Sequence, residues 1–471
     1  MWRVRACLAD SCGPWADARY LYVGRHRDDF NGDGYSDLVV GAYGLGRLLG
    51  SDNEGLVFVY HGSAAGLPSA PNVTIRNPDR QAGAHFGLSV AAAADLNGDG
   101  FADLIVGAPS QGDNGHGYAF VYYGSAAGLG EVPDERLPNP APQPNAAFGQ
   151  SVSGTGDING DGFDDIAVGA PNQSNPQPNE GVVFVFYGGA SGVSTAPLVL
   201  DNPFNQNNSA FGTSVAGAGD VNGDGYVDLL VGARRLSNPE NEEGGVFVFF
   251  GSRAGITDAG VNLDNPMNQP FGNFGASASG AGDLNGDGYE DVVVGAVTQG
   301  LNEEGRAFVY HGSPTGVGST PTLRLDNPQR QARGFFGSSV ARAGDLNGDG
   351  FPDLAIGAYG QGTGPAAFSG AAFVYYGGSG GVSAAPDVSV ANPSEQTEGF
   401  FGYSLASAGD VDGDGVADLA VGAYGHGTGA QVATGSVHVF LGTRDGVPVL
   451  PTYSLENPTG ESVAFFGASV D

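Results

Sequence analysis

Seven short acidic segments contain the residues of this chain whose types and spacing could do chemistry. Each has the pattern D-x-[ND]-G-D-G-x-x-D, and the first aspartates stand at positions 29, 95, 157, 220, 283, 345 and 410. The intervals between them are 66, 62, 63, 63, 62 and 65 residues. Seven copies at a nearly constant period indicate an internal repeat, in which each unit places several side-chain oxygens in one tight turn.

These oxygens are the ligands that a hard divalent cation prefers. Calcium takes six to eight oxygen ligands, and alternate positions of one loop can supply most of them. An EF-hand loop starts in the same way, but it closes with a glutamate at position twelve and is flanked by helices. Here position twelve is apolar, as at Val106, and an aspartate at position nine takes the place of that glutamate. We therefore expect up to seven structural calcium sites, each in the loop of a β-hairpin.

The candidate metal ligands occupy positions one, three, five, seven and nine of every segment, and position seven contributes its backbone carbonyl. They are Asp29, Asn31, Asp33, Tyr35 and Asp37; Asp95, Asn97, Asp99, Phe101 and Asp103; Asp157, Asn159, Asp161, Phe163 and Asp165; Asp220, Asn222, Asp224, Tyr226 and Asp228; Asp283, Asn285, Asp287, Tyr289 and Asp291; Asp345, Asn347, Asp349, Phe351 and Asp353; and Asp410, Asp412, Asp414, Val416 and Asp418.

Ordinary hairpin turns are the competing interpretation, because Asn-Gly and Asp-Gly pairs favour such turns for conformational reasons. Turn geometry does not account for three aspartates in each segment, or for the fourth that Asp412 adds to the last one. Carboxylates this close repel one another unless a cation neutralises them. Three carboxylates in an exposed loop indicate weak sites, with dissociation constants of roughly 10⁻⁴ to 10⁻³ M.

The elements that position these segments are predicted to be short strands. In the second repeat, strands are expected at 86–90 and 103–108 on either side of the acidic segment, and at the aromatic-rich stretch 117–124. A fourth strand ends at an Asn-Pro pair in every repeat, since proline cannot donate to a strand ladder. Four antiparallel strands per unit predict an all-β fold, a seven-bladed β-propeller. A linear β-solenoid is the alternative, but its repeats are usually much shorter.

The two ends of the chain bear on how such a ring closes. Residues 466–470 (FGASV) form an eighth copy of the first strand with no acidic segment after it. We therefore expect the C-terminal strand to join the first blade and to close the ring. The propeller is assigned to residues 29–471. Residues 1–28 show no repeat pattern and are interpreted as an atypical N-terminal segment, from a misplaced start, a frame error or a disordered tail.

Composition argues against several classes of function. The formal net charge is −33 and all 18 basic residues are arginine, so nucleic acid is not an expected partner. Without lysine, there is neither a Walker A phosphate loop nor a Schiff-base mechanism. No run of residues has the length of a membrane-spanning helix, so no membrane insertion is expected. The two cysteines, Cys7 and Cys12, exclude a disulfide framework, and the sequence shows no signal peptide.

The flanking strings resemble those of a known family. Phe86-Gly87 precedes the second acidic segment and Gly107-Ala108-Pro109 follows it, which is the arrangement of FG-GAP repeats. The resemblance covers residues 29–471, and the repeats resemble the N-terminal β-propeller of integrin α subunits. It implies calcium loops on one face, a protein or glycan ligand on the other, and an extracellular or cell-surface location. On the ligand face it would place the loops 43–54, 359–369 and 424–434.

Two features separate this chain from integrin α subunits. Neither leg domains nor a membrane span are expected from this sequence, and it carries an acidic segment in every repeat, where integrins have them in only some. Receptor signalling is therefore not expected from the resemblance.

The leading prediction is a binding or adhesion module and not an enzyme. No G-x-S-x-G nucleophile string and no zinc-type Cys/His spacing occur, and His61 and His311 are interpreted as ordinary strand residues. A secreted hydrolase or lyase acting on a polysaccharide is the first alternative, because acidic residues could serve as acid and base. A purely structural scaffold domain is the second.

Overall fold

The computed structural model describes residues 27–45, 53–257, 259–362, 367–427 and 433–471, together with two short strands near the N-terminus. These two strands, β1 (Cys7–Leu8) and β2 (Ser11–Cys12), form a separate antiparallel pair. The remainder of the N-terminal segment lies outside the described residues, so its interpretation stays a prediction. The described residues contain strands and turns and no α-helix.

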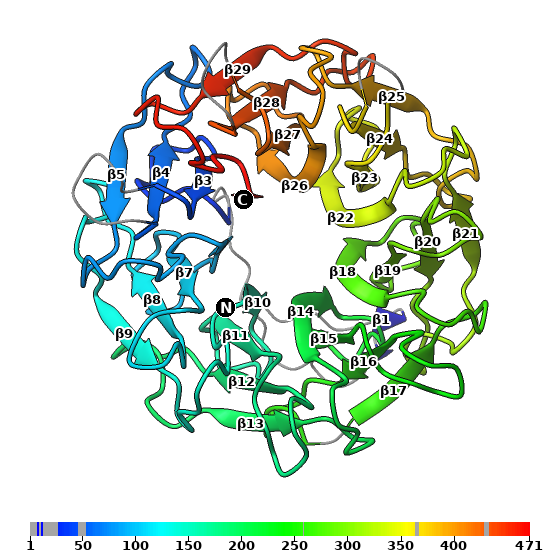
Figure 1. The fold of residues 1–471 in the computed structure, drawn as a ribbon. Helices are drawn as coiled ribbons and strands as arrows, with labels where there is room; N and C mark the ends of the chain where they lie inside the picture. Colours follow the sequence, from blue (N-terminus) through cyan, green and yellow to red (C-terminus); the bar gives the residue numbers. More distant parts are fainter. Residues whose placement is uncertain are drawn as a thin grey trace.

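Seven four-stranded antiparallel sheets are arranged around a central channel, which confirms the predicted propeller (Figure 1). We number the blades 1 to 7 in the order of their acidic loops. The first strand of each blade lies nearest the channel and the fourth forms the outer edge (Figure 1). From blade 1 to blade 7, the first strands are β30 (Ser469–Val470), β6 (Ser89–Ala92), β10 (Ser151–Gly156), β14 (Phe211–Gly219), β18 (Phe274–Gly282), β22 (Phe336–Gly344) and β26 (Phe401–Gly409).

The two middle strands of each blade are almost wholly buried. In the same blade order, the second strands are β3 (Leu38–Ala42), β7 (Leu104–Ala108), β11 (Asp165–Ala170), β15 (Asp228–Ala233), β19 (Asp291–Ala296), β23 (Asp353–Ala358) and β27 (Asp418–Ala423). The third strands are β4 (Leu56–Tyr60), β8 (Tyr118–Tyr122), β12 (Val182–Phe186), β16 (Gly245–Phe249), β20 (Arg306–Tyr310), β24 (Ala371–Tyr375) and β28 (Ser436–Phe440).

These strands are apolar at nearly every position because both faces of each blade pack against a neighbour. In β4, Val57 and Val59 join a cluster shared with blade 2, while Phe58 and Tyr60 join a cluster shared with blade 7. Seven such clusters lie between the seven pairs of adjacent blades. The core of the protein is therefore distributed around the ring between its blades.

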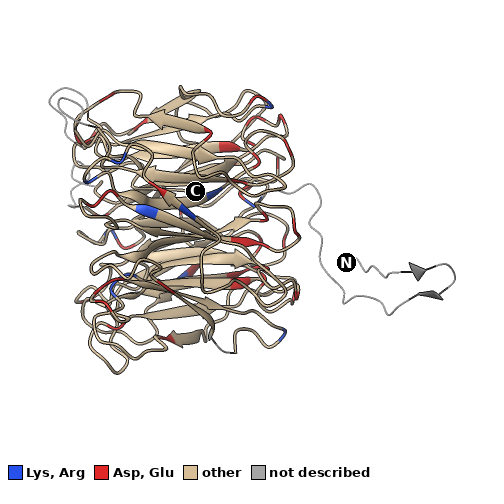
Figure 2. Ribbon diagram, turned by 90° about the vertical axis from the view of Figure 1, so that its right-hand side faces the viewer, with Lys and Arg blue, Asp and Glu red and all other residues tan. Residues whose placement is uncertain are grey.

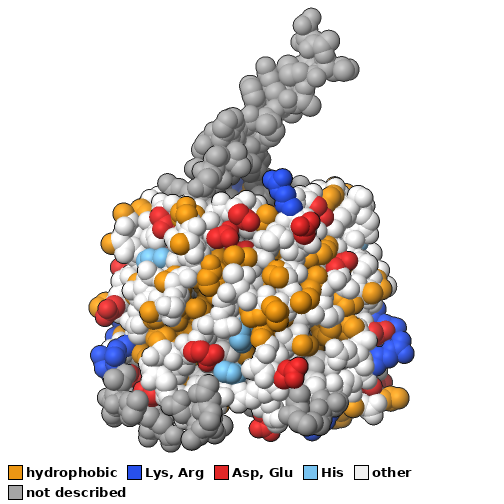
Figure 3. Space-filling model, turned by 90° about the horizontal axis from the view of Figure 1, so that it is seen from above, with side chains coloured by type: hydrophobic (Ala, Val, Ile, Leu, Met, Phe, Trp, Pro, Cys, Tyr) orange, Lys and Arg blue, Asp and Glu red, His pale blue; other side chains and the backbone are white. Residues whose placement is uncertain are grey.

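The fourth strands are short and form the outer wall. They are β5 (Val73–Arg76), β9 (Glu135–Pro138), β13 (Leu198–Asp201), β17 (Ala259–Asp264), β21 (Leu323–Asp326), β25 (Val388–Ala391) and β29 (Tyr453–Glu456). An Asn-Pro pair follows each of them, as the sequence predicts. Figure 3 shows one side of this wall, with hydrophobic side chains in a band across its middle. Short edges that end at proline leave little free ladder for another strand to join.

The Phe-Gly strings depart from the predicted strand in one respect. The strand expected at 86–90 begins only at Ser89, and in blade 4 the ladder shifts register between Phe211 and Ser214. The glycine of the string is the cause, because it has a positive φ in every blade, for example +80° at Gly87 and +83° at Gly212. The phenylalanine before it is buried between blades, and in blades 4 to 7 it pairs with the second strand across the register shift.

The C-terminal strand closes the ring as predicted. In β30, Val470 pairs with Val40 and Ser469 pairs with Gly41 of β3. The N–H of Asp471 donates to the carbonyl of Val39 at 3.1 Å, and the N–H of Val39 donates back at 2.7 Å. The first blade is thus assembled from the two ends of the propeller sequence.

Deleting residues 466–471 should therefore destabilise the whole propeller. The loss of buried Phe466 alone should cost about 3–5 kcal/mol, and the strand pairing adds to that value. Urea unfolding measures the free-energy change. Restoring the segment with residues 401–406 (FGYSLA), the same strand of blade 7, should recover most of the stability. A deleted protein that unfolds like the intact one would contradict closure by β30.

One core position of blade 7 holds a histidine, whose protonation makes the stability of the fold depend on pH. His438 of β28 occupies the place that phenylalanine has in the six other third strands. Its Nδ1 lies 2.9 Å from Oγ of Ser454 and its Nε2 lies 3.1 Å from Oγ of Ser436. Burial lowers the pKa of His438 to about 4. The folded protein therefore holds a neutral imidazole at pH values where an exposed histidine would be charged.

Replacing His438 with phenylalanine should remove part of the acid sensitivity of the fold. The unfolded chain binds a proton near pH 6.5 and the folded chain near pH 4, so stability is present above pH 6.5 and is lost as the pH falls toward 4. Between pH 7.5 and pH 5 the wild-type protein should lose about 2 kcal/mol that the variant retains. Urea unfolding at both pH values measures this difference, and equal losses in the two proteins would contradict the assignment.

Candidate functional site

Each acidic segment directly precedes the second strand of its blade, and in blades 2 to 7 it connects the first strand to the second. All seven lie on one face of the ring. In the side view, strands run between two faces, and the acidic residues lie mainly in the loops at the strand ends (Figure 2). The structure therefore brings the predicted ligands of each segment together within one loop, at the same place in every blade. We call these the acidic loops, numbered as their blades.

In each loop the side chains fold inward onto the backbone. In the second loop, Asp95 accepts the N–H of Gly98 at 2.7 Å and the N–H of Gly100 at 2.9 Å. Oδ1 of Asn97 accepts the N–H of Asp99 at 2.8 Å. In the other six loops the N–H at position six likewise donates to position one, and the N–H at position five donates to position three. The carboxylate at position five accepts the N–H at position seven, as Asp99 does from Phe101 at 3.0 Å. These hydrogen bonds hold the side chains at positions one, three and five against the backbone of the turn.

The aspartate at position nine is the most buried member of the set. In all seven loops this side chain is 0% exposed. In the second loop, Oδ2 of Asp103 accepts the N–H of Leu96 at 2.8 Å, and its Oδ1 accepts the N–H of Gly124 at 2.9 Å. Leu96 belongs to the acidic loop and Gly124 follows the third strand, so this carboxylate joins the loop to the blade. Each of its oxygens keeps a second lone pair that a cation could use.

Burial raises the pKa of every position-nine aspartate. The pKa of Asp103 rises to about 8, although the two backbone N–H donors act in the opposite direction. The nearby carboxylates of Asp99 and Asp95 raise it further. The other six have pKa values of about 7 or about 8 from the same leading cause. A bound cation would favour the ionised form that burial and neighbouring carboxylates disfavour.

The seventh loop brings three carboxylates into one small volume. Oxygens of Asp410, Asp412 and Asp418 all lie within 4.8 Å of one another. Asp412 stands where the other loops have asparagine, and burial and the adjacent Asp414 both raise its pKa. The donor set of the acidic loops is made only of oxygen, from carboxylates, an amide and a backbone carbonyl. This set fits a hard cation such as calcium and not a metal that prefers nitrogen or sulfur.

Neighbouring acidic loops also contact one another, which the sequence analysis missed. The aromatic ring at position seven of one loop packs on the glycine at position four of the loop before it. A Cβ on Gly98 would lie 2.6 Å from the ring of Phe163, and a Cβ on Gly286 would lie 2.6 Å from the ring of Phe351. The signal was present in the sequence, because position four is always glycine and position seven is aromatic in six of the seven loops.

A backbone hydrogen bond accompanies this contact at most blade boundaries. The N–H at position eight of one loop donates to the carbonyl at position one of the loop before it, as from Ala102 to Asp29 at 3.1 Å. The same bond joins Asp164 to Asp95, Val227 to Asp157, Glu290 to Asp220, Ala417 to Asp345 and Ser36 to Asp410. In the sixth loop position eight is Pro352, which has no N–H to donate.

The face opposite the acidic loops carries aromatic side chains in three adjacent blades. Phenylalanine before the Phe-Gly string stacks on tyrosine after the Gly-Ala string in blades 6, 7 and 1, and the ring centroids lie 5.0 Å apart in each pair. We call these residues the aromatic arc; they are Phe335 with Tyr359, Phe400 with Tyr424, and Phe465 with Tyr43. The predicted ligand loops 43–54, 359–369 and 424–434 start at these tyrosines, but each lies partly outside the described residues.

Comparison with known proteins matches the repeats that the structure shows. A model described as FG-GAP repeat matches residues 28–60, 86–122, 148–186, 211–249 and 401–440. A model described as FG-GAP-like repeat matches residues 283–356, and together the two cover more than half of the chain. The chain belongs to the FG-GAP repeat family. Its blades are FG-GAP repeats, and the resemblance inferred from the flanking strings is confirmed.

Integrin α subunits are among the relatives of this FG-GAP propeller. It is 31% identical over 287 residues to integrin alpha pat-2 of Caenorhabditis briggsae, across 56% of this chain and 22% of the relative. It is 33% identical over 225 residues to integrin alpha-5 of Xenopus laevis, across 46% of this chain and 20% of the relative. The match thus spans about a fifth of the length of these relatives. In the part of the chain that the structure describes, no helix is long and apolar enough to span a membrane.

The fifth acidic loop offers a matched test of the contact between loops. Gly286 and Gly288 both have positive φ, +72° and +92°, but a Cβ on Gly288 would meet no atom within 4 Å. Gly288→Ala should cost about 1–2 kcal/mol for the left-handed backbone alone. Gly286→Ala should cost a further 1–3 kcal/mol or so, because its methyl group would overlap the ring of Phe351. Urea unfolding measures both, and adding Phe351→Ala should abolish the difference between them. Equal costs in the presence of Phe351 would rule out the interlock.

Proposed function

We propose that this FG-GAP propeller binds calcium in its acidic loops and serves as an extracellular or cell-surface binding module. The observation that carries the proposal is the recurrence, in every blade, of an all-oxygen donor set that includes a fully buried aspartate. The ligands proposed are the side chains at positions one, three, five and nine and the backbone carbonyl at position seven. The similarity to integrin α subunits supports the same function.

Charge gives a physical reason for calcium. The chain has a formal net charge of −33, and the acidic loops hold 22 aspartates at the ligand positions. Seven divalent ions carry fourteen positive charges, so they would reduce the net charge to −19. Self-repulsion of this size opposes a compact fold, and cations bound within the loops relieve it where the carboxylates are closest. Calcium would therefore be structural, and the binding function would belong to another surface.

The face opposite the acidic loops is the proposed ligand surface, for a protein or a glycan. It carries the aromatic arc, whose rings lie just before the first strands and just after the second strands of blades 6, 7 and 1. Tyr403 lies beside the arc in β26 and is 41% exposed. The arc residues are half-buried, apart from buried Phe335, so each ring except that one shows part of its surface beside exposed Tyr403. Aromatic surface grouped in one place often marks a binding site. This surface supports a binding module more directly than it supports a hydrolase.

Removing calcium should lower the melting temperature of the protein by about 10 °C. At a tenfold excess of calcium over the dissociation constant, each site adds about 1.4 kcal/mol, so seven independent sites add about 10 kcal/mol. For a chain of this length, 1 kcal/mol corresponds to about 1 °C. Differential scanning calorimetry in EDTA and in 5 mM CaCl₂ measures the shift, and elemental analysis counts the ions bound.

A double substitution in one loop controls this experiment. Asp283→Asn with Asp287→Asn should remove one ion and about one seventh of the shift. Asp445→Asn, at an exposed aspartate outside the acidic loops, should change neither quantity. An unchanged melting temperature in EDTA would defeat the calcium assignment. An equal shift with magnesium would also defeat it, because it would indicate general charge screening.

A further inference from the structure

Two neighbouring positions on the face opposite the acidic loops show which blades have groups free for a ligand. One is the residue before each Phe-Gly string, and the other is the second residue after each Gly-Ala string. In blades 6, 7 and 1 a phenylalanine packs over a glycine, so that a Cβ on Gly360, Gly425 or Gly44 would lie 2.5–2.7 Å from the ring. In these blades the side chain at the first position therefore packs directly against the second position and covers it.

In blades 2 and 5 a hydrogen bond joins the side chains at the same two positions. Nδ1 of His85 lies 2.9 Å from Oγ of Ser110 in blade 2. Nδ2 of Asn273 donates to Oγ1 of Thr298 at 2.8 Å in blade 5. Five of the seven blades therefore pair these residues internally.

Blades 3 and 4 leave the second position without a partner. The residue before the Phe-Gly string is alanine in both, Ala147 and Ala210, and a methyl group cannot bond the polar side chain beside it. The second positions are Asn172 and Arg235, both exposed. Within the described residues, neither side chain has a hydrogen-bond or ion-pair partner.

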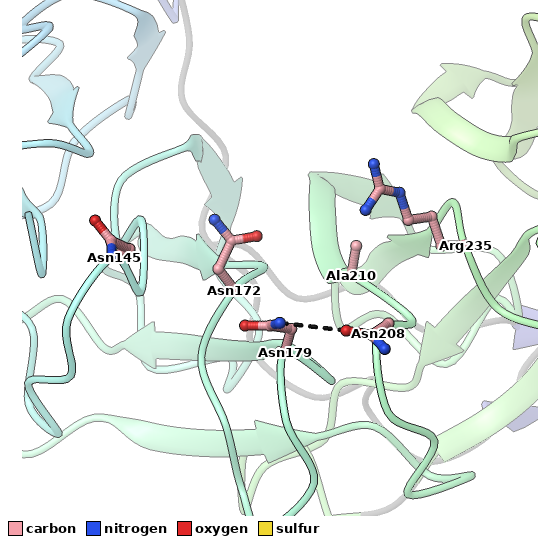
Figure 4. A pocket seen from close by; sticks show the side chains of 6 residues that line it. All are labelled: Asn145, Asn172, Asn179, Asn208, Ala210 and Arg235. Atoms are coloured by element: carbon pink, nitrogen blue, oxygen red, sulfur yellow. Dashed lines mark hydrogen bonds between the residues drawn. The ribbon is translucent and has the colours of Figure 1, made fainter.

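These two side chains line a pocket between blades 3 and 4, with a volume of about 260 Å³. Asn145, Asn179, Asn208 and Ala210 complete its lining. Figure 4 shows Asn172 and Arg235 on opposite sides of the pocket, with Asn179 and Asn208 below them, joined by a hydrogen bond. Nδ2 of Asn179 donates to Oδ1 of Asn208 at 3.2 Å. The pocket thus joins four amides and one guanidinium, and its one apolar side chain is Ala210.

Turn geometry explains only some of these residues. Asn145, Asn179 and Asn208 have φ values of +56°, +50° and +58°, a backbone conformation that asparagine tolerates well. Asn172 and Arg235 are not among the residues with positive φ, so the backbone does not require their types. Their side chains are the two that the blade-by-blade comparison identifies as unpartnered.

The charge at the pocket is unusual for this protein. Arg234 and Arg235 are the only adjacent arginines in a chain with 51 acidic and 18 basic residues. Arg136, Arg306, Arg324, Arg333 and Arg342 each form an ion pair with an aspartate or glutamate. Within the described residues Arg235 forms no ion pair, a property it shares with several other arginines, but it stands next to a second arginine. Although Glu242 lies near Arg234, the two arginines together give the pocket rim a positive charge. An anionic group is the ligand that this rim would attract.

We propose that the pocket binds an acidic saccharide unit, with its carboxylate or sulfate on Arg235 and its hydroxyls on Asn172, Asn179 and Asn208. This inference rests on the proposed function, because it names the ligand class for the same face. An amide offers a donor and an acceptor side by side, which suits neighbouring hydroxyls on a sugar ring. An acidic peptide fits less well, because only Ala210 could contact its apolar groups.

Isothermal titration calorimetry with the full chain in 150 mM NaCl and 1 mM CaCl₂ tests the proposal. The probes are a hexagalacturonate, which carries carboxylates, and a sulfated heparin hexasaccharide. Maltohexaose is the neutral control and a hexaglutamate peptide is the acidic control without sugar. One of the two acidic sugars should bind at least tenfold more tightly than either control, and the better one identifies the anionic group.

Substitutions assign the binding to the pocket. Arg235→Gln should weaken the acidic sugar about tenfold or more, the loss expected for one hydrogen bond to a charged group. Asn172→Asp keeps the side-chain shape but adds a like charge, and it should weaken binding at least as much. Arg253→Gln is the matched control, because Arg253 is an exposed arginine in the connection between the third and fourth strands of blade 4. It should leave the affinity within about twofold.

The outcomes separate this inference from the calcium proposal. Equal affinity for the acidic sugars and for maltohexaose or hexaglutamate would overturn the saccharide assignment, and wild-type affinity in Arg235→Gln would overturn the site. Each variant is first shown to keep the calcium-dependent melting shift of the wild type. If that shift is absent from every protein while Arg235→Gln still weakens sugar binding, the calcium proposal fails and the pocket stands.

Discussion

The fold depends on a fully buried aspartate carboxylate at the start of every second strand. Its two oxygens accept one N–H from the acidic loop and one from a glycine two residues after the third strand, as Asp103 does with Leu96 and Gly124. Three parts of the blade are therefore held at a single point. Burial makes the charged form of this group unfavourable, which the raised pKa expresses, so the arrangement is most stable when a positive charge lies close by. The metal proposed for the loop and the packing of the blade thus depend on the same side chain.

Much of the architecture could be predicted because it repeats. Seven copies of the acidic segment at a nearly constant period indicated seven blades. The apolar third strands indicated sheets packed on both faces, and the FGASV segment indicated how the ring closes. The start of the first strand was placed three residues early in blade 2, because a string such as Phe86-Gly87 has a strand-like composition while its glycine adopts a positive φ. Composition predicts the tendency to form a strand, but it does not show where a ladder is interrupted.

Contacts between blades were harder to predict than contacts within them. The packing of Phe163 on Gly98 joins two loops whose residues are 65 positions apart, and nothing within one repeat requires it. The pocket on the opposite face has the same character, since Asn145 and Arg235 come from different repeats and meet only because blades 3 and 4 are adjacent. From the sequence, the ligand face is predicted only by analogy with integrin α subunits, and it stays a prediction. The particular groups on it became visible when equivalent positions could be compared in space.

The proline at position eight of the sixth loop interrupts the ring of hydrogen bonds between neighbouring acidic loops. Six backbone hydrogen bonds connect seven loops, and the boundary between blades 5 and 6 is the one that lacks this bond, because Pro352 has no N–H. The polypeptide of the propeller starts and finishes in blade 1. The series of hydrogen-bonded loops instead starts at blade 6, passes through blades 7, 1, 2, 3 and 4, and finishes at blade 5. The loops therefore form an open series of hydrogen-bonded neighbours, whose two ends lie side by side at a different blade boundary from the blade where β30 closes the ring.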